Sequence, residues 1–156
     1  VMSILKSLCK FFFILFLIIS PIKGEAGKKK KFLSTKYSEV NVRNGPGLNN
    51  LIIFKILKKG YPLLVNESFE DWRRVEDFTG KSGWISKTQL LDETNVVVMV
   101  DDNIFKFPST NSKLLAEVRS KYVLKIVKCR HKWCKVREGN ISGWILKKSL
   151  WGVNQN

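Results

Sequence analysis

The chain has 156 residues and a mass of 18.0 kDa, which allows one ordinary domain or two very small ones and excludes a large multidomain enzyme. Its 28 Lys and Arg residues outnumber 13 Asp and Glu residues, for a net charge of +15. We therefore expect attraction to an anionic surface, ligand or polymer. Because His131 is the single histidine, the usual machinery for general base catalysis and zinc binding is largely excluded.

The first residues have the pattern of a secretory signal peptide. Lys6 and Lys10 precede the apolar run 11–19, and small residues follow before Ala26. We expect residues 1–26 to be removed by cleavage after Ala26. The nine uninterrupted apolar residues fall short of the roughly 20 that span a bilayer as a helix. The segment therefore predicts a periplasmic or secreted protein without a stable membrane anchor.

Residues 27–33 contain four adjacent lysines, Lys28–Lys31, and we interpret them as a flexible basic tail. Two interpretations of this tail stay open. It tethers the protein to an anionic polymer or membrane surface, at roughly 1 kcal/mol per lysine near the surface, or it is a solvated leader with no binding role.

The rest of the chain is a tandem repeat. The Trp-x-x-Val pattern at 72–75 recurs at 133–136, and the Gly-Trp-Ile pattern at 83–85 recurs at 143–145. The two patterns recur after 61 and 60 residues respectively. This spacing predicts two copies of one small domain, at residues 34–92 and 93–153.

Each copy has the signals of short antiparallel strands. Polar and apolar residues alternate or β-branched residues cluster at 39–43, 51–57, 61–65 and 71–76. A glycine-containing turn is expected at 58–60 and a short helical turn at 86–90. About five strands in so short a stretch leave no room for a helical layer. An all-β fold follows, with each sheet closed into a small barrel.

Three segments of the first copy carry a resemblance to a known family: 40–47 (Val-Asn-Val-Arg-Asn-Gly-Pro-Gly), 71–75 and 83–85. Together they resemble the bacterial SH3-like domain, a small β-barrel found in exported cell-envelope proteins. The second copy is similar to the closing repeat of two-repeat members from Gram-negative bacteria, and the resemblance covers roughly residues 34 to 153. It implies a noncatalytic binding module that contacts peptidoglycan or other envelope components.

The loop of that motif is a candidate functional element in the first copy alone. It contains a basic residue and two glycines that permit a tight turn: Arg43, Asn44, Gly45, Pro46 and Gly47. The corresponding stretch 103–109 keeps a basic residue and a proline but lacks the glycines. We therefore assign no binding role to the loop of the second copy.

Cys129 and Cys134 flank four residues between two predicted strands. In a hairpin they face each other, and an oxidising compartment would favour a disulfide between them. Two alternatives stay open: a metal site with His131 between the thiols, and a nucleophilic cysteine paired with that histidine. The usual Cys-x-x-Cys spacing of zinc sites is absent.

Tryptophans and neighbouring basic residues form the candidate binding surface. Side chains alternate along a strand, so inward-facing isoleucines at 85 and 145 would leave the adjacent tryptophans outward. The candidate set is Trp72, Arg74, Trp84, Trp133, Lys135 and Trp144. It suits a ligand with an apolar body and a negative group. The alternative is that each tryptophan caps a very small core.

Two function classes remain. In the first, the protein is a noncatalytic binder of cell-wall glycan or peptide, or an adaptor that binds an envelope protein. In the second, charge alone drives binding to an anionic polymer or membrane surface. We expect no nucleic-acid partner because the chain is predicted to be exported, and we expect no metal or cofactor. No catalytic motif is visible in the sequence.

Overall fold

The computed structural model describes residues 30–154. The predicted signal peptide and residues 27–29 of the predicted tail lie outside this range. Within it, no helix is long and apolar enough to cross a membrane.

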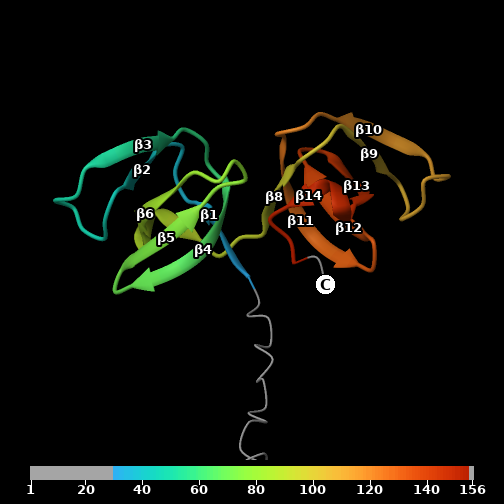
Figure 1. The fold of residues 1–156 in the computed structure, drawn as a ribbon. Helices are drawn as coiled ribbons and strands as arrows, with labels where there is room; N and C mark the ends of the chain where they lie inside the picture. The colour runs from blue at the N-terminus through green and yellow to red at the C-terminus, as the bar shows by residue number, and fades with distance from the viewer. Residues whose placement is uncertain (1–29, 155–156) are drawn as a thin grey trace, which may run out of the picture.

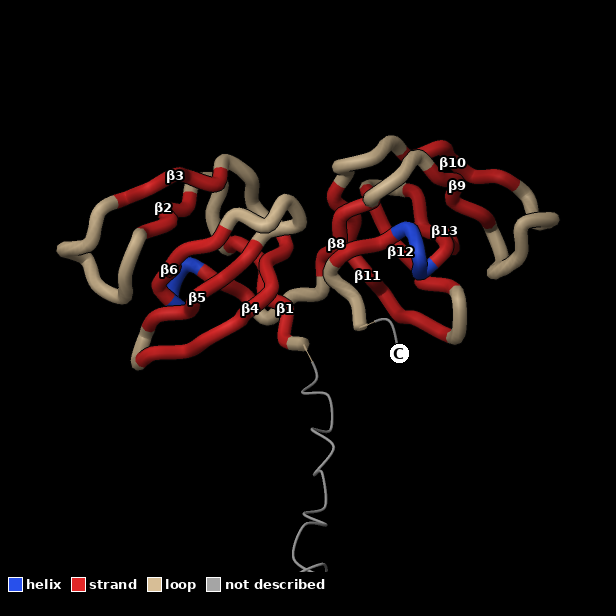
Figure 2. The backbone as a smooth tube through the Cα atoms, in the orientation of Figure 1, coloured by secondary structure: helices blue, strands red, loops and turns tan. Residues whose placement is uncertain are grey.

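The described residues form two antiparallel sheets that lie side by side (Figure 1). The first sheet contains β1 (Lys31–Thr35), β2 (Val40–Arg43), β3 (Ile52–Ile56), β4 (Pro62–Phe69), β5 (Trp72–Glu76), β6 (Ser82–Ser86) and β7 (Leu90–Leu91). The second contains β8 (Asn95–Val98), β9 (Asp102–Phe105), β10 (Leu114–Val118), β11 (Val123–Arg130), β12 (Trp133–Glu138), β13 (Ile141–Leu146) and β14 (Leu150–Trp151). Short 3-10 helices, η1 (Lys87–Gln89) and η2 (Lys147–Ser149), precede the last strand of each sheet (Figure 2).

The two sheets have the same topology. Their strand orders are β3-β2-β6-β5-β4-β1-β7 and β10-β9-β13-β12-β11-β8-β14. Adding seven to each strand number of the first order gives the second. The hairpins β2–β3 and β9–β10 extend to opposite sides of the molecule (Figure 1). The predicted all-β fold of two tandem small domains is therefore confirmed.

The N-terminal limit of the first domain differs from the prediction. Lys31, Phe32 and Leu33, which the sequence pattern places in the basic tail, belong to β1 and pair with β4. The sequence does not predict β1 because its first residue, Lys31, is the last of four adjacent lysines that resemble a tail. An exposed lysine is compatible with a surface strand, because only its backbone has to pair with the next strand. Leu33 is only 8% exposed and enters the core, so the folded domain starts earlier than residue 34.

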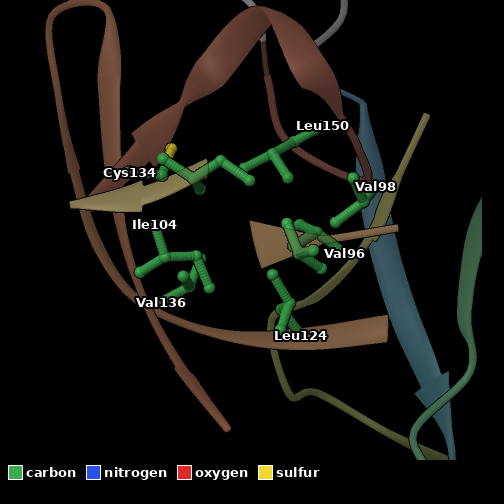
Figure 3. Packing of buried hydrophobic residues seen from close by; sticks show 9 residues of the cluster. Val96, Val98, Ile104, Leu124, Cys134, Val136 and Leu150 are labelled. Carbon is green, nitrogen blue, oxygen red and sulfur yellow. The ribbon is translucent and has the colours of Figure 1, made fainter. Parts of the chain in front are cut away.

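Each domain has its own hydrophobic core, formed by the inward residues of its strands. The first core consists of Leu33, Val40, Val42, Ile56, Leu63, Val75, Ile85 and Leu90. The second, shown in Figure 3, consists of Val96, Val98, Ile104, Val118, Leu124, Cys134, Val136, Ile145 and Leu150. Ile85 and Ile145 are fully buried, so the isoleucine of each Gly-Trp-Ile motif packs inward, as the alternation along the strand requires.

The glycine of that motif is required by the close approach of two strands. A Cβ at Gly83 would lie 2.5 Å from Val42 Cγ1 and 2.8 Å from the carbonyl oxygen of Arg43. A Cβ at Gly143 would lie 2.5 Å from Ile104 Cγ2 and 2.7 Å from the carbonyl oxygen of Phe105. The recurrence of glycine therefore reflects packing of β6 on β2 and of β13 on β9.

The two domains contact each other through aromatic and buried polar side chains. The ring of Trp151 lies 5.2 Å from Phe32 and 6.5 Å from Phe78, both in edge-on geometry. Asn95 Nδ2 donates a buried hydrogen bond of 3.0 Å to Ser34 Oγ. Because these contacts join residues of both domains, the short connection at 92–94 does not act as a free linker.

Candidate functional site

Four residues of the first domain share the outer face of three adjacent strands. Val75 and Ile85 point into the core, so the alternating positions on β5 and β6 point outward. Arg74 lies directly opposite Trp84, and Trp72 lies opposite Phe69; residues paired in this way share a face. We call Phe69, Trp72, Arg74 and Trp84 the aromatic face. Phe69 is 50% exposed and both tryptophans are half-buried.

The positive charge on the aromatic face has a partner. Arg74 Nη1 lies 3.7 Å from Glu67 Oε2, and both side chains are about half exposed. Exposed pairs of this kind contribute about 0–1 kcal/mol, so water or a ligand carboxylate can replace the glutamate at little cost. The aromatic face thus combines apolar rings with a guanidinium that is weakly held.

The loop predicted at 43–47 is an ordered turn closed by its arginine. Arg43 Nη1 donates to the carbonyl oxygens of Leu48, at 2.9 Å, and Asn50, at 2.6 Å. A Cβ at Gly45 would lie 2.5 Å from Asn50 Oδ1, which explains the glycine. Arg43 is therefore a positioning residue that shapes the loop, and its backbone pairs with Trp84.

The candidate residues of the second domain occupy the equivalent outer face, where Trp144 is more covered than its counterpart Trp84, whereas Trp133 is partly buried like Trp72. Trp144 lies between Lys135 and Phe105 in the strand register and is only 8% exposed. The rings of Phe105 and Trp133 are 5.9 Å apart, edge to face. Trp144 lies outside the core cluster but is buried beside these two rings on the same face, so the geometry gives it a structural role.

Basic side chains surround these aromatic rings. Lys128 lies directly opposite Lys135 across the strands, and Arg130 lies opposite Trp133. The Lys128 Nζ atom is 5.9 Å from the centroid of Trp144, a distance that fits a cation–π contact. We call Lys128, Arg130, Trp133, Lys135 and Trp144 the basic face.

The sequence alone does not identify three members of these two faces, Phe69, Lys128 and Arg130, nor Phe105 beside Trp144. Strand register decides which residues lie beside a tryptophan, and the sequence does not give that register. One signal was available: Glu67 and Lys128 are 61 residues apart, the period of the repeat. The reversal of charge at matched positions marks where the surfaces of the two domains differ.

The predicted disulfide is confirmed. Cys129 and Cys134 are directly paired on β11 and β12, with Cα atoms 4.0 Å apart and a bond between the sulfurs. Because both sulfurs are bonded, neither is available in this form as a metal ligand beside His131 or as a nucleophile paired with that histidine. Within residues 30–154, no group of three or more His, Cys, Asp or Glu side chains is placed to hold a metal ion.

The shifted pKa values of Tyr61 and Asp101 belong to groups away from the two faces. Burial raises the pKa of Tyr61 to about 12, and the nearby Asp77 carboxylate adds to the shift; the Tyr61 hydroxyl donates to Asp77 Oδ2 at 3.5 Å. Hydrogen bonds from the Ser120 N–H and the Arg119 guanidinium lower the pKa of Asp101. Each shift has a local structural cause, and neither forms an acid–base pair on the aromatic or the basic face.

Solved structures offer only a distant comparison. Two structures from Trichomonas vaginalis are similar to the chain: NlpC2, at 16% identity and TM-score 0.37, and NlpC1, at 15% identity and TM-score 0.37. The alignments cover 81% and 85% of this chain but 49% and 50% of those structures, so the chain spans about half their length. No curated protein matches the chain significantly.

The family comparison agrees with the repeat seen in the sequence and in the sheets. The bacterial SH3 domain family matches residues 36–92 and again residues 99–152. Each match contains one seven-stranded sheet except for its first strand. The chain therefore belongs to the bacterial SH3 domain family, of which it contains two tandem copies.

Proposed function

We propose that the protein is a noncatalytic binding module of the cell envelope that contacts peptidoglycan through the aromatic face of its first domain. The observation that carries the proposal is the strand register, which gathers Phe69, Trp72 and Trp84 around Arg74 on one outer surface. Membership in the bacterial SH3 domain family supports a binding role.

The chemistry of the aromatic face suits a polymer of sugars and short peptides. Partly exposed aromatic rings offer flat apolar area, to which each tryptophan adds a polar N–H, and this suits the C–H faces and hydroxyl groups of sugar rings. The Arg74 guanidinium presents paired N–H donors that fit a carboxylate, a group found on peptide ends. Its present partner, Glu67, is about half exposed, and a ligand carboxylate could replace it.

A noncatalytic role is supported by what the reactive side chains do. Cys129 and Cys134 are joined in a disulfide, so neither is a nucleophile in this form. The single histidine, His131, lines a hollow together with Lys132, Leu146, Lys147 and Lys148. That lining holds no carboxylate to orient the imidazole and no hydroxyl to be activated, as a hydrolytic triad would require.

In this proposal the mature chain begins after Ala26 and acts in the periplasm or outside the cell. The apolar run at 11–19 supports the export step. The Cys129–Cys134 disulfide supports the location, because disulfides persist in oxidising compartments.

The test is sedimentation with isolated peptidoglycan. We expect the wild-type protein to pellet with the polymer and Trp72→Ala to bind about tenfold more weakly, as for a central aromatic contact. Trp133→Ala is the matched variant in the second domain, where Arg130 stands in place of the exposed ring of Phe69, and it should change binding less. Circular dichroism must show that both variants are folded. Binding that is unchanged by Trp72→Ala would overturn the proposal.

A second candidate function has its own supporting observation. Residues 99–152 contain twelve Lys and Arg against four acids, a charge that attracts anionic polymers or membrane surfaces without a shaped site. Charge-driven binding falls steeply with salt, whereas contact with the aromatic face should persist. Pelleting at low and at high salt therefore separates the two functions.

A further inference from the structure

A basic hollow lies at the tip of the β11–β12 hairpin in the second domain. It has a volume of about 410 Å³ and is lined by His131, Lys132, Leu146, Lys147 and Lys148. Three of these five residues are lysines, one is the single histidine of the chain, and none is acidic. We call these five residues the basic hollow.

The first domain has the same backbone at the equivalent place. The N–H of Lys147 donates to the carbonyl oxygen of Lys132 at 2.8 Å, and the N–H of Lys87 donates to that of Asp71 at 2.7 Å. The preceding hairpin residues, His131 and Glu70, also match, with φ of 48° and 46°. Lys132 therefore stands where the first domain has Asp71.

The charges at this shared backbone position are opposite. In the first domain Lys87 Nζ lies 2.5 Å from Asp71 Oδ1. An ion pair therefore joins the hairpin tip to η1. In the second domain a lysine replaces that aspartate, and a histidine replaces Glu70. Within residues 30–154, neither Lys132 nor Lys148 takes part in a salt bridge. Lys132 and Lys148 thus bring basic side chains to the hollow at the place where the first domain has an ion pair.

The surrounding chain strengthens the positive potential. From residue 120 to the C-terminus there are nine Lys and Arg residues and one acid, Glu138. Within this segment Lys128 also replaces an acid of the first domain, Glu67, and lies opposite Lys135. A concave site inside such a field concentrates small anions.

We propose that the basic hollow is a binding site for a phosphate group, as a free ion or as a monoester. Lysine ammonium groups act as mobile point charges that donate to phosphate oxygens, and three of them line one small hollow. A phosphate offers at least three acceptor oxygens in three directions, which matches donors that converge from a hairpin tip and from η2. A planar carboxylate offers two and suits the arginine fork better.

The hollow lies outside the aromatic face, so the proposal does not depend on peptidoglycan binding. Leu146, which lines the hollow, pairs with Trp133, and the basic face is therefore its immediate neighbour. Trp72→Ala, in the other domain, should leave phosphate binding unchanged. Failure of one proposal thus leaves the other standing.

The test measures binding of inorganic pyrophosphate to the disulfide-bonded protein by calorimetry. Lys132→Asp installs the residue of the first domain, on a backbone that accepts aspartate there, and should weaken binding at least about tenfold, because it removes a charge-assisted donor and adds a repelling charge. Lys113→Asp makes the same change of charge at an exposed position just before β10 and should weaken binding less than about twofold. Equal weakening by both variants, or no binding by the wild type, would overturn the proposal.

A neutral variant and a second probe complete the design. Lys132→Gln should give an intermediate loss, which shows that the effect is not caused by a new repulsion alone. Vesicles of phosphatidic acid and phosphatidylcholine test a lipid source of the phosphate, because phosphatidic acid carries a phosphate monoester. Vesicle binding that is lost in Lys132→Asp but kept in Lys113→Asp identifies a lipid headgroup, whereas pyrophosphate binding with vesicle binding insensitive to both identifies a soluble phosphate.

Discussion

The β4–β5 hairpin of the first domain and the β11–β12 hairpin of the second have the same backbone and opposite surfaces. Four matched positions differ in character: Glu67 and Lys128, Phe69 and Arg130, Glu70 and His131, Asp71 and Lys132. The first hairpin holds exposed aromatic area with ion pairs at Glu67 and Asp71. The second holds converging basic groups. One fold thus presents an aromatic surface in one copy and an anion-attracting surface in the other.

The difference extends over the whole of each domain. Residues 36–92 contain nine basic and seven acidic residues, a net charge of +2, whereas residues 99–152 contain twelve and four, a net charge of +8. Seven positions of the two cores, in contrast, hold aliphatic residues in both domains, although Val40 of the first core corresponds to Asp102 and Cys134 of the second corresponds to Arg73. Packing therefore limits change inside the domains, while the outer faces are free to take on different ligands.

The largest expected effect is a loss of stability on replacing the glycine of the Gly-Trp-Ile motif, a packing constraint that the two domains share. Gly83→Ala and Gly143→Ala should each lower the free energy of unfolding of their own domain by about 3 kcal/mol, the upper end for overpacking. The reason is that the new Cβ meets a backbone carbonyl, which cannot move aside, at 2.8 Å and 2.7 Å respectively. Urea denaturation measures the loss.

Gly47→Ala is the matched control for these variants. The nearest atom to its Cβ would be Nδ2 of the Asn50 side chain, at 3.0 Å, and a side-chain amide can rotate away. We expect a loss below about 1 kcal/mol. A loss at Gly83 no larger than that at Gly47 would show that the strands separate easily, and the common packing constraint would then be wrong.

The second prediction concerns a feature that only one domain has. Reduction of the Cys129–Cys134 disulfide should destabilise the second domain by about 2 kcal/mol, the chain-entropy value for so short a loop. Cys134 is fully buried in the core, and reduction leaves its sulfur in place, so no cavity adds to the loss. Hydrogen exchange of core amides, measured with and without a thiol reductant, reports each domain separately.

The first domain supplies the control within the same molecule. The equivalent residues there are Ser68 and Arg73, which are paired across β4 and β5 and have no sulfur to form a covalent link. Its core amides should therefore keep their protection under reducing conditions. Equal loss in both domains would mean that the contacts around Trp151 couple them into one cooperative unit.

Much of this architecture could be predicted from the sequence, for reasons that particular residues show. The repeat was visible because each Trp-x-x-Val and Gly-Trp-Ile pattern is set by core packing at Val75 and Ile85. The disulfide could be predicted because a four-residue separation in a hairpin brings two cysteines together. β1 was missed, since its first residue, Lys31, continues a lysine block that resembles a tail.

The candidate site was only partly predictable. Local alternation placed Trp72, Arg74 and Trp84 on one face, but it could not say that Phe105, rather than a basic residue, lies opposite Trp144. Nor does spacing along the chain reveal that Lys132 and Lys147 lie at one hairpin tip, joined by a backbone hydrogen bond. Both facts depend on register between strands that are distant in sequence.

The smallest expected effect concerns the ion pair that distinguishes the two hairpin tips. A hydrogen bond and the charge of Lys87 lower the pKa of Asp71 below its ordinary value. Lys87→Met removes both, so the pKa should rise toward the usual value of about 3.9. Carboxyl chemical shifts followed by NMR during a pH titration measure the change, and Lys81→Met, elsewhere in the same domain, should leave the pKa of Asp71 where it is.

The sign of the accompanying pH effect follows from linkage. Because the folded-state pKa of Asp71 is lowered, the pair stabilises the folded state above the ordinary carboxyl pKa and loses this effect as the pH falls through the lowered value. Wild type and Lys87→Met should therefore differ in stability at neutral pH and have similar stability in acid.

The same titration applied to Lys132→Asp sharpens the comparison between the two hairpin tips. A lowered pKa for the introduced carboxyl shows that the lysines of η2 reach the hollow, and an ordinary pKa shows that they do not.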